Sequence, residues 1–448
     1  MIRVYEKPGY KHKEKGGAMN YRVDNNPLKP YSRSVSIIGI GATPFMLTKD
    51  DPELDGLGEG ELFGYAAIDA MKDAGLTAKD VDFFIQAQGG PGWQTDCGTP
   101  NMHVANWFGM KGKGSCHHSE ACCTGYVALE QAVSYVASGA YDIVLSGTCD
   151  FSYSIIQLSR PSMFRRHFTE EMFTEVLANA YPKDYTRWSH AGGSLSSESW
   201  LDQYVKDNNI EDKIDDVLCT LSKNLRYTAS LNPLSLNHNT YDDMAKMFRM
   251  ENADKFLRSK FNPKIGMYMR ASNFEQRADG AAAVIVCPTE MAYKYTDHPI
   301  EILGMGHSCL EAGMPQLERF ATEAAYKQVR DLTGLTGKDM DLFMANDFFM
   351  QSSILAAEMC EYLPEGQGWE YALEGRTMFN GDAPINTNGG RCQYGHAHGT
   401  SGMHDLYEAV KQMRGEMGPT QVNRPVNYAM IRGFGGAQNL MCTILKKN

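Results

Sequence analysis

The pattern of apolar and polar residues repeats along the chain. A short apolar run at 37–41 is followed by a segment with apolar residues at helical spacing, 61–74. The same order returns at 302–306 and 318–332. Apolar runs that alternate with amphipathic segments predict the strands and helices of an α/β sheet, with right-handed crossovers where neighbouring strands are parallel.

Closer comparison of the two halves indicates an internal duplication. Residues 75–84 and 334–343 are identical at seven of ten positions. Further along, four residues of the first half match four of the second at one constant offset: Gly125, Leu129, Ala132 and Val133 against Gly402, Leu406, Ala409 and Val410. Paired strands are predicted near 143–147 and 429–433, and again near 281–287 and 437–445. We therefore expect two such sheets, related by a pseudo-twofold axis in one body.

The repeat sets the domain organisation that we predict. Residues 1–34 are a polar N-terminal extension, 35–297 form the first half, and 298–448 form the second half. The first half is interrupted at 155–235 by a mostly helix-like insertion, and long insertions beside a site often cover it or bind ligand. Residues 236–276 are expected to return irregularly to the last strand of the first half.

Composition narrows the functional classes. The 448 residues carry a formal net charge of −11, which argues against nucleic acid as the main partner. No apolar run is long enough to span a membrane, and no secretory signal is visible. The 11 cysteines contain no Cys-x-x-Cys pair and indicate free thiols in a reducing compartment. We expect a cytoplasmic protein.

Cys122 is the first candidate for chemistry. It lies just before a predicted helix that starts near Gly125, where the helix dipole would lower the pKa of a thiol and favour the nucleophilic thiolate. The alternative is a buried structural cysteine. At the equivalent place in the second half, the constant offset puts Gly399 opposite Cys122, just after a loop that contains His396 and His398. A pseudo-twofold axis near these helices would bring a cysteine and a histidine together, which is an arrangement that activates thiol nucleophiles.

Several motifs together carry a family resemblance over about residues 35–448. They are Cys122-x-Thr124-Gly125, the strand Asp279-Gly280-Ala281-Ala282-Ala283, the loop Asn386-x-Asn388-Gly389-Gly390 with Gly395-His396, and Gly433-Phe434-Gly435-Gly436. This combination resembles the thiolases, most of all the sterol-carrier-protein-x-like and archaeal branches. The resemblance implies a duplicated, five-layered αβαβα fold with a helical loop-domain insertion and a homodimeric core.

The resemblance also implies roles for individual residues. Cys122 would attack the substrate, and His396 would activate it and bind the thioester oxygen. Asn346 would hold a water in that first oxyanion hole, and the backbone N–H groups of Cys122 and Gly435 would form a second one. Ketosynthase spacing would instead select Cys123 as the nucleophile.

The sequence departs from the pattern at Gly433, where many thiolases carry a second catalytic cysteine. Neither Cys392 nor Cys442 matches that motif, so a water, another side chain or His398 would have to act as the base. Family members with glycine at this position often work with a small partner that has an OB-fold and a zinc ribbon. We expect such a partner here.

Coenzyme A is the implied co-substrate, and no permanently bound cofactor is expected. Arg160, Arg165 and Arg166 in the insertion could pair with its phosphates, although a solvated basic turn would look the same. Cys116, His117 and His118 lie near Cys122 in sequence, but their crowding and the lack of a second ligand pair predict no metal site.

The predicted activity is that of an acyl-CoA thiolase, an acyltransferase that cleaves β-ketoacyl-CoA or runs the reverse Claisen condensation. The alternatives are a condensing enzyme of the ketosynthase or hydroxymethylglutaryl-CoA synthase type and a non-catalytic thiolase-like scaffold. Aromatic residues in the insertion more often form a small core than an aryl pocket. An aromatic substrate still fits, since the chain is similar to thiolases that cleave 2-benzoylsuccinyl-CoA to benzoyl-CoA and succinyl-CoA.

Overall fold

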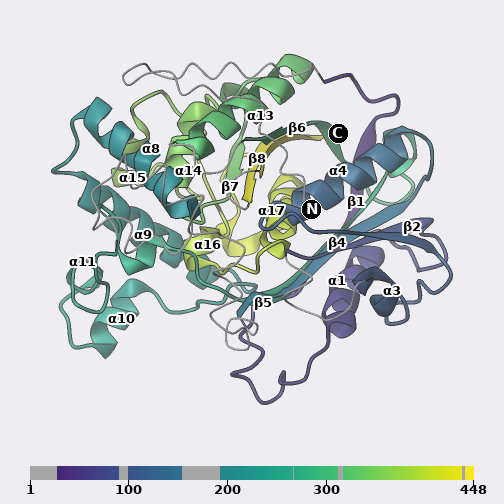
Figure 1. The fold of residues 1–448 in the computed structure, drawn as a ribbon, viewed down its shortest axis with the longest axis horizontal. Helices are drawn as coiled ribbons and strands as arrows, with labels where there is room; N and C mark the ends of the chain where they lie inside the picture. The colour runs from purple at the N-terminus through teal and green to yellow at the C-terminus, as the bar shows by residue number, and fades with distance from the viewer. Residues whose placement is uncertain (1–27, 90–98, 154–191, 266, 311–315, 436–438) are drawn as a thin grey trace, which may run out of the picture.

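The computed structural model describes residues 28–89, 99–153, 192–265, 267–310, 316–435 and 439–448. Nearly all of the N-terminal extension and the first part of the insertion therefore lie outside the described residues. Within the described parts, the chain forms one layered α/β body (Figure 1).

A nine-stranded sheet organises the molecule, in the order β3-β2-β4-β5-β1-β6-β9-β8-β7. Strand β2 is parallel to β3 and β4, β7 is parallel to β8, and the other neighbours are antiparallel. The strands are β1 Val35–Ala42, β2 Phe83–Ala87, β3 Gly114–His118, β4 Val144–Phe151, β5 Asp279–Pro288, β6 Ile300–Cys309, β7 Leu342–Ala345, β8 Tyr428–Gly435 and β9 Asn439–Lys447.

The strand order confirms the internal duplication. Reading outward from the middle of the sheet, β1-β5-β4-β2 in the first half corresponds to β6-β9-β8-β7 in the second. The two half-sheets were expected to be separate, but they are joined, because β1 and β6 pair at Val35, Ser36 and Ile37. Strand β3 has no counterpart in the described part of the second half.

Helices complete five layers, as the resemblance implied. Helices α4 and α17 pack against each other between the two half-sheets, α1 and α3 cover the first half-sheet from outside, and α13 covers the second (Figure 1). The helices are α1 Glu59–Asp73, α3 Pro100–Val104, α4 Thr124–Ala137, α8 Gly192–Asn208, α9 Ile214–Leu231, α10 Tyr241–Met247, α11 Ala253–Leu257, α12 Thr289–Ala292, α13 Leu317–Thr333, α14 Ser352–Met359, α15 Gly368–Leu373, α16 Gly390–Gln393 and α17 Thr400–Arg414.

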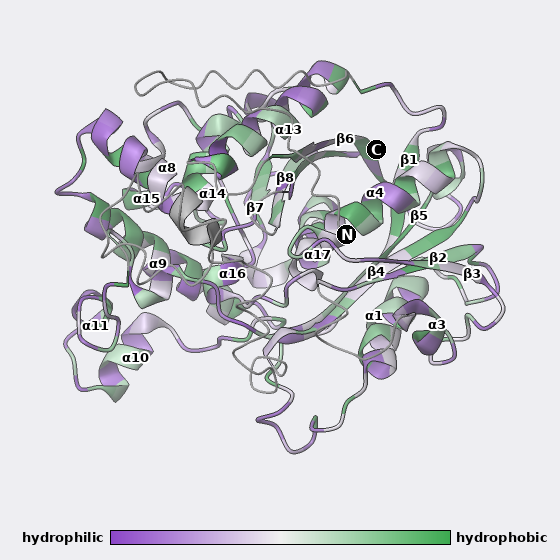
Figure 2. Ribbon diagram, in the orientation of Figure 1, coloured by the Kyte–Doolittle hydropathy of each residue, from purple (hydrophilic) through white to green (hydrophobic). Residues whose placement is uncertain are grey.

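The middle layer is apolar because it touches sheet on both sides. Leu129 and Val133 of α4, and Leu406 and Val410 of α17, are fully buried in one core that draws strands from both half-sheets. Figure 2 shows this band of hydrophobic residues across the strands and central helices, with polar residues toward the periphery. Burying each such side chain stabilises the fold by about 1.5–3 kcal/mol. The residues that match at a constant offset are thus core positions of equivalent helices.

The return segment 236–276 is more regular than expected. Helices α10 and α11 form there, and each begins at a capping side chain. Thr240 accepts a hydrogen bond from the backbone N–H of Asp243, and Asn252 accepts one from Lys255. Such caps satisfy backbone donors that a short helix leaves unpaired, and both were readable in the sequence. No helix in the described ranges is long and apolar enough to cross a membrane.

Candidate active site

The N-terminal ends of α4 and α17 cross at very close range. The backbone N–H of Gly125 donates to the carbonyl of Gly399 at 3.1 Å. A Cβ on Gly125 would lie 2.8 Å from that carbonyl oxygen, and a Cβ on Gly399 would lie 2.6 Å from the Cβ of Thr124. Only glycine allows this approach. The crossing brings the two equivalent loops, one with Cys122 and one with His396, to the same place.

A tight turn presents Cys122 at this crossing. Ala121 has a left-handed backbone with φ 47°, which is uncommon for a residue with a side chain. The Thr124 hydroxyl holds the turn, since it accepts from the backbone N–H of Glu120 at 2.7 Å and donates to the carbonyl of Ala121 at 2.7 Å. Strain of this kind persists where surrounding contacts fix a functional residue.

Cys122 and His396 form a buried pair. The Cys122 Sγ lies 3.3 Å from Nε2 of His396, and Nδ1 of the same ring lies 2.9 Å from Oγ of Ser401. The Ser401 hydroxyl donates to the carbonyl of Ala397 at 3.2 Å, so it accepts from His396 Nδ1–H. This assignment leaves Nε2 with a lone pair that faces the thiol. The imidazole is thereby oriented as a base toward Cys122.

The thiol is not a preformed thiolate, which corrects the expectation of a lowered pKa. Burial, assisted by the negative charge of Glu275, raises the pKa of Cys122 to about 12. Burial also lowers the pKa of His396 well below its usual value. Loss of solvation outweighs the helix dipole here because the side chains are almost completely enclosed. Both groups are therefore neutral at rest, and the proton has to move from sulfur to nitrogen as the thiol attacks.

Cys123 points elsewhere. It is fully buried, and its thiol donates to the carbonyl of Asn439 at 3.3 Å. The structure thus brings Cys122, and not Cys123, against His396.

Asn346 follows β7, and Gly435 ends β8, in the second half-sheet. The Asn346 Oδ1 accepts from the N–H of Phe348 at 3.0 Å, and its Nδ2 donates to the carbonyl of Phe434 at 2.5 Å. A Cβ on Gly435 would lie 2.4 Å from the backbone nitrogen of Cys123, so glycine lets the end of β8 pass beside the Cys122 turn.

A further wall of the site is the segment 273–278, just before β5. The N–H of His396 donates to the carbonyl of Gln276 at 2.7 Å, and the N–H of Ala278 donates to the carbonyl of His396 at 3.0 Å. Glu275 and Arg277 extend from this segment and form an ion pair at 3.4 Å. Nη1 of Arg277 lies 3.0 Å from Nε2 of His398. Two charged residues are therefore placed next to the catalytic histidine candidate.

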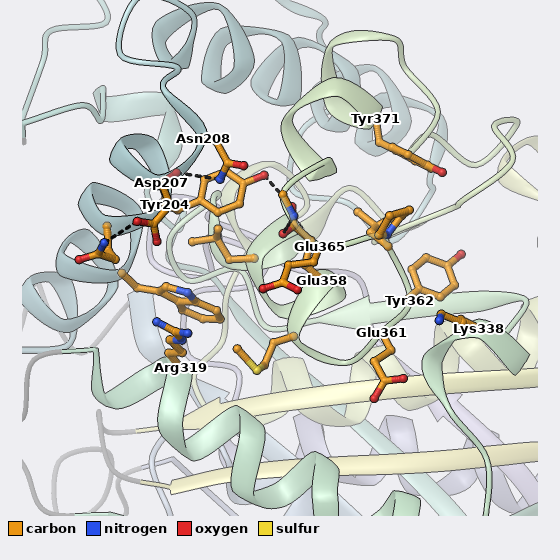
Figure 3. Close-up of a pocket in the computed structure, with 17 residues that line it drawn as sticks. Tyr204, Asp207, Asn208, Arg319, Lys338, Glu358, Glu361, Tyr362, Glu365 and Tyr371 are labelled. Atoms are coloured by element: carbon orange, nitrogen blue, oxygen red, sulfur yellow. Dashed lines mark hydrogen bonds between the residues drawn. The ribbon is translucent and has the colours of Figure 1, made fainter. Parts of the chain in front are cut away.

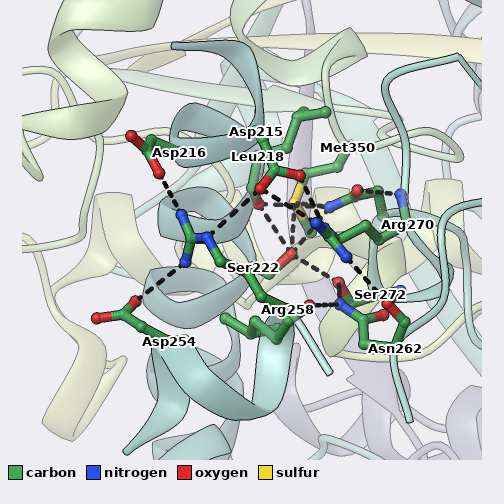
Figure 4. A network of polar contacts seen from close by, with 12 residues as sticks. Asp215, Asp216, Leu218, Ser222, Asp254, Arg258, Asn262, Arg270, Ser272 and Met350 are labelled. Atoms are coloured by element: carbon green, nitrogen blue, oxygen red, sulfur yellow. Dashed lines mark hydrogen bonds and ion pairs between the residues drawn. The ribbon is translucent and has the colours of Figure 1, made fainter. Parts of the chain in front are cut away.

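A polar network anchors this segment to α9 (Figure 4). Arg270 pairs with Asp215 at 2.8 Å, and Nδ2 of Asn273 donates to the hydroxyl of Ser222 at 3.0 Å. The Ser222 hydroxyl also contacts Sδ of Met350 at 3.3 Å. Because Met350 follows the Asn346 loop, the network fixes two walls of the site relative to the insertion.

A pocket of about 1130 Å³ lies apart from this pair, between α8, α13 and α14 (Figure 3). One of its acids, the partly buried Glu358, accepts hydrogen bonds from Tyr204 Oη at 2.6 Å and from the N–H of Gly366 at 2.6 Å. These contacts tie helices and loops together. None of its lining residues is a cysteine or a histidine, so the Cys122–His396 pair is the stronger candidate for catalysis.

Two expectations concern ligands. Arg160, Arg165 and Arg166 lie outside the described residues, so their proposed contact with coenzyme A phosphates stays a prediction. Among the described residues, no group of three or more His, Cys, Asp or Glu side chains gathers as a metal site would require.

Comparison with known proteins gives a consistent result. Residues 306–447 match the family described as thiolase C-terminal domain-like. Acetyl-CoA acetyltransferase of Methanothermobacter thermautotrophicus is 24% identical over 90% of this chain and 97% of its own length. Benzoylsuccinyl-CoA thiolase subunit BbsB of Thauera aromatica is 24% identical over 90% of this chain and 95% of its own. The last third of the chain is thus similar to the C-terminal domain of thiolases, and nearly the whole chain is similar to these two enzymes.

A solved structure supports the same fold. It is titled Ltp2-ChsH2(DUF35) aldolase and superposes with a TM-score of 0.68 at 19% identity, covering 92% of this chain and 97% of that one. At this identity the likeness concerns the fold alone.

At Gly433, where the resemblance to thiolases implies a second cysteine, the space beside the backbone is already filled. A Cβ on Gly433 would lie 2.2 Å from the ring of Tyr126, and one on Gly402 would lie 2.7 Å from it. The Tyr126 hydroxyl donates to Asp405 at 2.5 Å and accepts from Arg391 at 3.3 Å. Tyr126 therefore occupies the space into which a side chain at 433 would extend.

Sequence reasoning missed Ser401 and Glu275. Ser401 comes five residues after His396 and belongs to the first turn of α17, so its link to the imidazole depends on how the loop folds back. Glu275 stands in no motif. Its nearness to the motif Asp279-Gly280 was the one available signal.

Removing the Ser401 hydroxyl is expected to slow turnover by about five- to tenfold. Ser401→Ala deletes one hydrogen bond, worth about 1 kcal/mol, and frees the imidazole to adopt the tautomer that turns N–H toward Cys122. Steady-state kinetics should show the loss in kcat, with KM little changed. Ser401→Thr keeps the hydroxyl and should retain most activity. Equal rates for the alanine variant and the wild type would remove Ser401 from the proton path.

Proposed function

We propose that this chain is an acyl-CoA thiolase, which cleaves a β-ketoacyl-CoA with free coenzyme A through an acyl-enzyme on Cys122. One observation carries the proposal. A thiol in a strained turn faces the lone pair of an oriented, neutral imidazole at 3.3 Å. This is the geometry that a thiol needs in order to lose its proton during attack.

The steps follow from these two groups. The Cys122 sulfur attacks the β-carbonyl carbon while its proton moves to Nε2 of His396. Collapse of the tetrahedral adduct breaks the carbon–carbon bond and leaves an acyl group on the sulfur. The departing acyl-CoA leaves as an enolate, which takes up a proton. Coenzyme A then attacks the acyl-enzyme, and His396 returns the proton to Cys122.

Charge that develops on oxygen needs hydrogen-bond donors. Asn346 Nδ2 has a second hydrogen beyond the one given to Phe434, and we propose that it holds a water beside His396 for the thioester oxygen. We propose that the N–H groups of Cys122 and Gly435 serve the acyl carbonyl, which the close approach of Gly435 to the backbone of Cys123 supports. Donors of this type contribute about 3–4 kcal/mol each to the transition state.

A panel of β-ketoacyl-CoA substrates, incubated with free coenzyme A, tests the proposal. Acetoacetyl-CoA and 2-benzoylsuccinyl-CoA are its two informative members, because the similar proteins are named for acetyl transfer and for benzoylsuccinyl-CoA cleavage. We expect CoA-dependent cleavage of at least one, and we propose an aromatic acyl group. Cleavage that proceeds equally well without coenzyme A would instead indicate aldol-type chemistry, as named for the superposed structure.

A condensing enzyme of the ketosynthase or hydroxymethylglutaryl-CoA synthase type is the second candidate. It would use the same Cys122 acyl-enzyme but would not release it to free coenzyme A. Incubation of the acyl-enzyme with coenzyme A alone separates the two, because a thiolase returns acyl-CoA at the rate of turnover.

We also propose that the chain works in a complex. Strand β3 is an edge of the sheet and pairs only with β2 within the described residues, which leaves one side for the β3 of a second copy. The superposed aldolase is named with a DUF35 protein, which supports a small second subunit, expected to be of the OB-fold and zinc-ribbon type.

The complex is testable by purification from the native source. We expect a heteromer built on a dimer of this chain, zinc in stoichiometric amount, and activity that collapses when the small protein is removed. Sizing by light scattering and metal analysis check this. A fully active homodimer without any zinc protein would contradict it.

A further inference from the structure

The proposed cleavage needs a second proton carrier besides His396. The enolate that leaves must gain a proton, and the incoming coenzyme A thiol must lose one. His396 is occupied in both half-reactions, because it holds the proton of Cys122 until that sulfur is released. A second group that can both give and take a proton near neutral pH has to reach the substrate.

Few ionisable side chains near Cys122 could carry this second proton. Asp150 accepts from the backbone N–H groups of Gly89 and Thr400, each at 2.8 Å, and it is fully buried. Asp347 is also fully buried, and it holds the N–H of Arg391 at 2.6 Å. These two carboxylates are anchors for loops and have no surface that a substrate could touch.

His398 is closer to the site but unsuited to the task. Its Nε2 lies 3.0 Å from Nη1 of Arg277, which can only donate, so that nitrogen acts as an acceptor. Burial and the Arg277 charge lower the pKa of His398 to about 3. Because the Arg277 guanidinium already occupies the Nε2 lone pair, His398 has no free acceptor with which to take a proton from the substrate.

Glu275 has the contacts that the others lack. Its backbone N–H is fixed by the carbonyl of Phe348 at 3.1 Å, and the next residue accepts from the N–H of His396. Its side chain is 9% exposed, so it is enclosed but reachable. The backbone next to it is bonded directly to His396, so Glu275 belongs to the wall of the site that holds the catalytic histidine candidate.

From this placement we infer that Glu275 is the second acid and base of the reaction, a role that rests on the proposed thiolase function. In cleavage, the carboxyl proton of Glu275 moves to the α-carbon of the enolate and leaves a carboxylate. That carboxylate then takes the proton of the coenzyme A thiol, whose sulfur attacks the acyl-enzyme. Cys122 leaves and recovers its own proton from His396, and Glu275 is again a carboxylic acid.

The electrostatics of the position agree with this role. Burial raises the pKa of Glu275 to about 7, and the Arg277 guanidinium at 3.4 Å keeps it from rising further. The other titratable groups that face it are Cys122 from the turn before α4 and Cys392 from α16, and both are thiols with raised pKa values. A carboxyl that is half ionised near neutral pH can serve in both directions.

Proton exchange isolates this step. The full-length protein, with any copurifying partner, is incubated with acetyl-CoA in D₂O, and loss of methyl protons is followed by mass spectrometry. Alkylation of Cys122 by iodoacetamide, which needs loss of the thiol proton but no second acid, is measured in a parallel sample. We expect Glu275→Gln to slow exchange by at least about a hundredfold, in line with loss of a general base, and to leave the rate of alkylation within about threefold of wild type.

The dependence on pH gives a second readout. Exchange requires the carboxylate, so the wild-type rate should fall as pH drops below about 7. The exchange rate of Glu275→Asp should be lower but should still fall as the pH drops, whereas the rate of Glu275→Gln should no longer depend on pH in this way. Glu408→Gln is the matched control. Glu408 is likewise buried with its pKa raised to about 7, but it is bound by Thr387 and Asn232, so the wild-type profile should persist.

The outcomes separate the two proposals. Exchange by Glu275→Gln within threefold of wild type would overturn the role of Glu275, and so would an equal loss of exchange and of Cys122 alkylation in a variant with unchanged melting temperature. If the wild type acetylates no cysteine and exchanges no protons, the thiolase function itself fails.

Discussion

Cys122→Ala is expected to abolish turnover and leave the fold intact. The variant removes the sulfur that attacks the substrate, and a methyl side chain cannot form a thioester. The side chain is small and lies in a turn held by the backbone and by Thr124, so its loss leaves little void. Activity should fall to the uncatalysed background, while the melting temperature stays within a few degrees of wild type.

The matched control is Cys123→Ala at the neighbouring position. That thiol contacts the carbonyl of Asn439 and has no contact with His396, so activity should remain within a few fold of wild type. Quenching during turnover and digestion should then place the acyl adduct on the peptide with Cys122 modified. An adduct on Cys123, or full activity in Cys122→Ala, would show that the nucleophile has been misassigned.

His396→Ala should lower kcat by at least about a hundredfold, because it removes both the base and an oxyanion donor. A distinctive change in pH dependence should accompany the loss. Burial holds the pKa of Cys122 at about 12, so without the imidazole the thiolate forms only through bulk ionisation. The remaining rate should therefore rise by about tenfold per pH unit through the alkaline range.

A second histidine controls for general effects of imidazole loss. His307 is partly exposed and pairs with Glu130 at 3.1 Å, outside the site. His307→Gln should keep a wild-type rate and profile. If His396→Ala retains activity within a few fold of wild type, or loses it without the alkaline rise, another group takes the thiol proton.

The sequence alone was enough to predict the duplication and the meeting of Cys122 with His396. Both follow from the constant sequence offset between two equivalent helices. Gly125 and Gly399 allow these helices to cross in close contact. The joining of the half-sheets was not predictable, because three paired residues at the start of β1 leave no pattern of their own.

Properties that depend on enclosure also escaped prediction. A helix start beside Cys122 favours thiolate, and that signal is local. The burial that reverses it exists only in the folded chain, and the negative charge that adds to it belongs to Glu275, more than a hundred residues away. Glu275 was missed for the same reason: it is far from Cys122 and His396 in the sequence, and no spacing rule links it to either.

Gly433 and Tyr126 are interlocked, and this limits the evolutionary routes open to the enzyme. A cysteine introduced at 433 alone would collide with the Tyr126 ring, and overpacking of this kind costs about 1–3 kcal/mol. Shrinking Tyr126 alone would open a void and take a partner from Asp405 and Arg391. Each single change is destabilising, so a thiol fits at position 433 only if Tyr126 is replaced at the same time. Proton transfer in this chain therefore has to use other residues of the site.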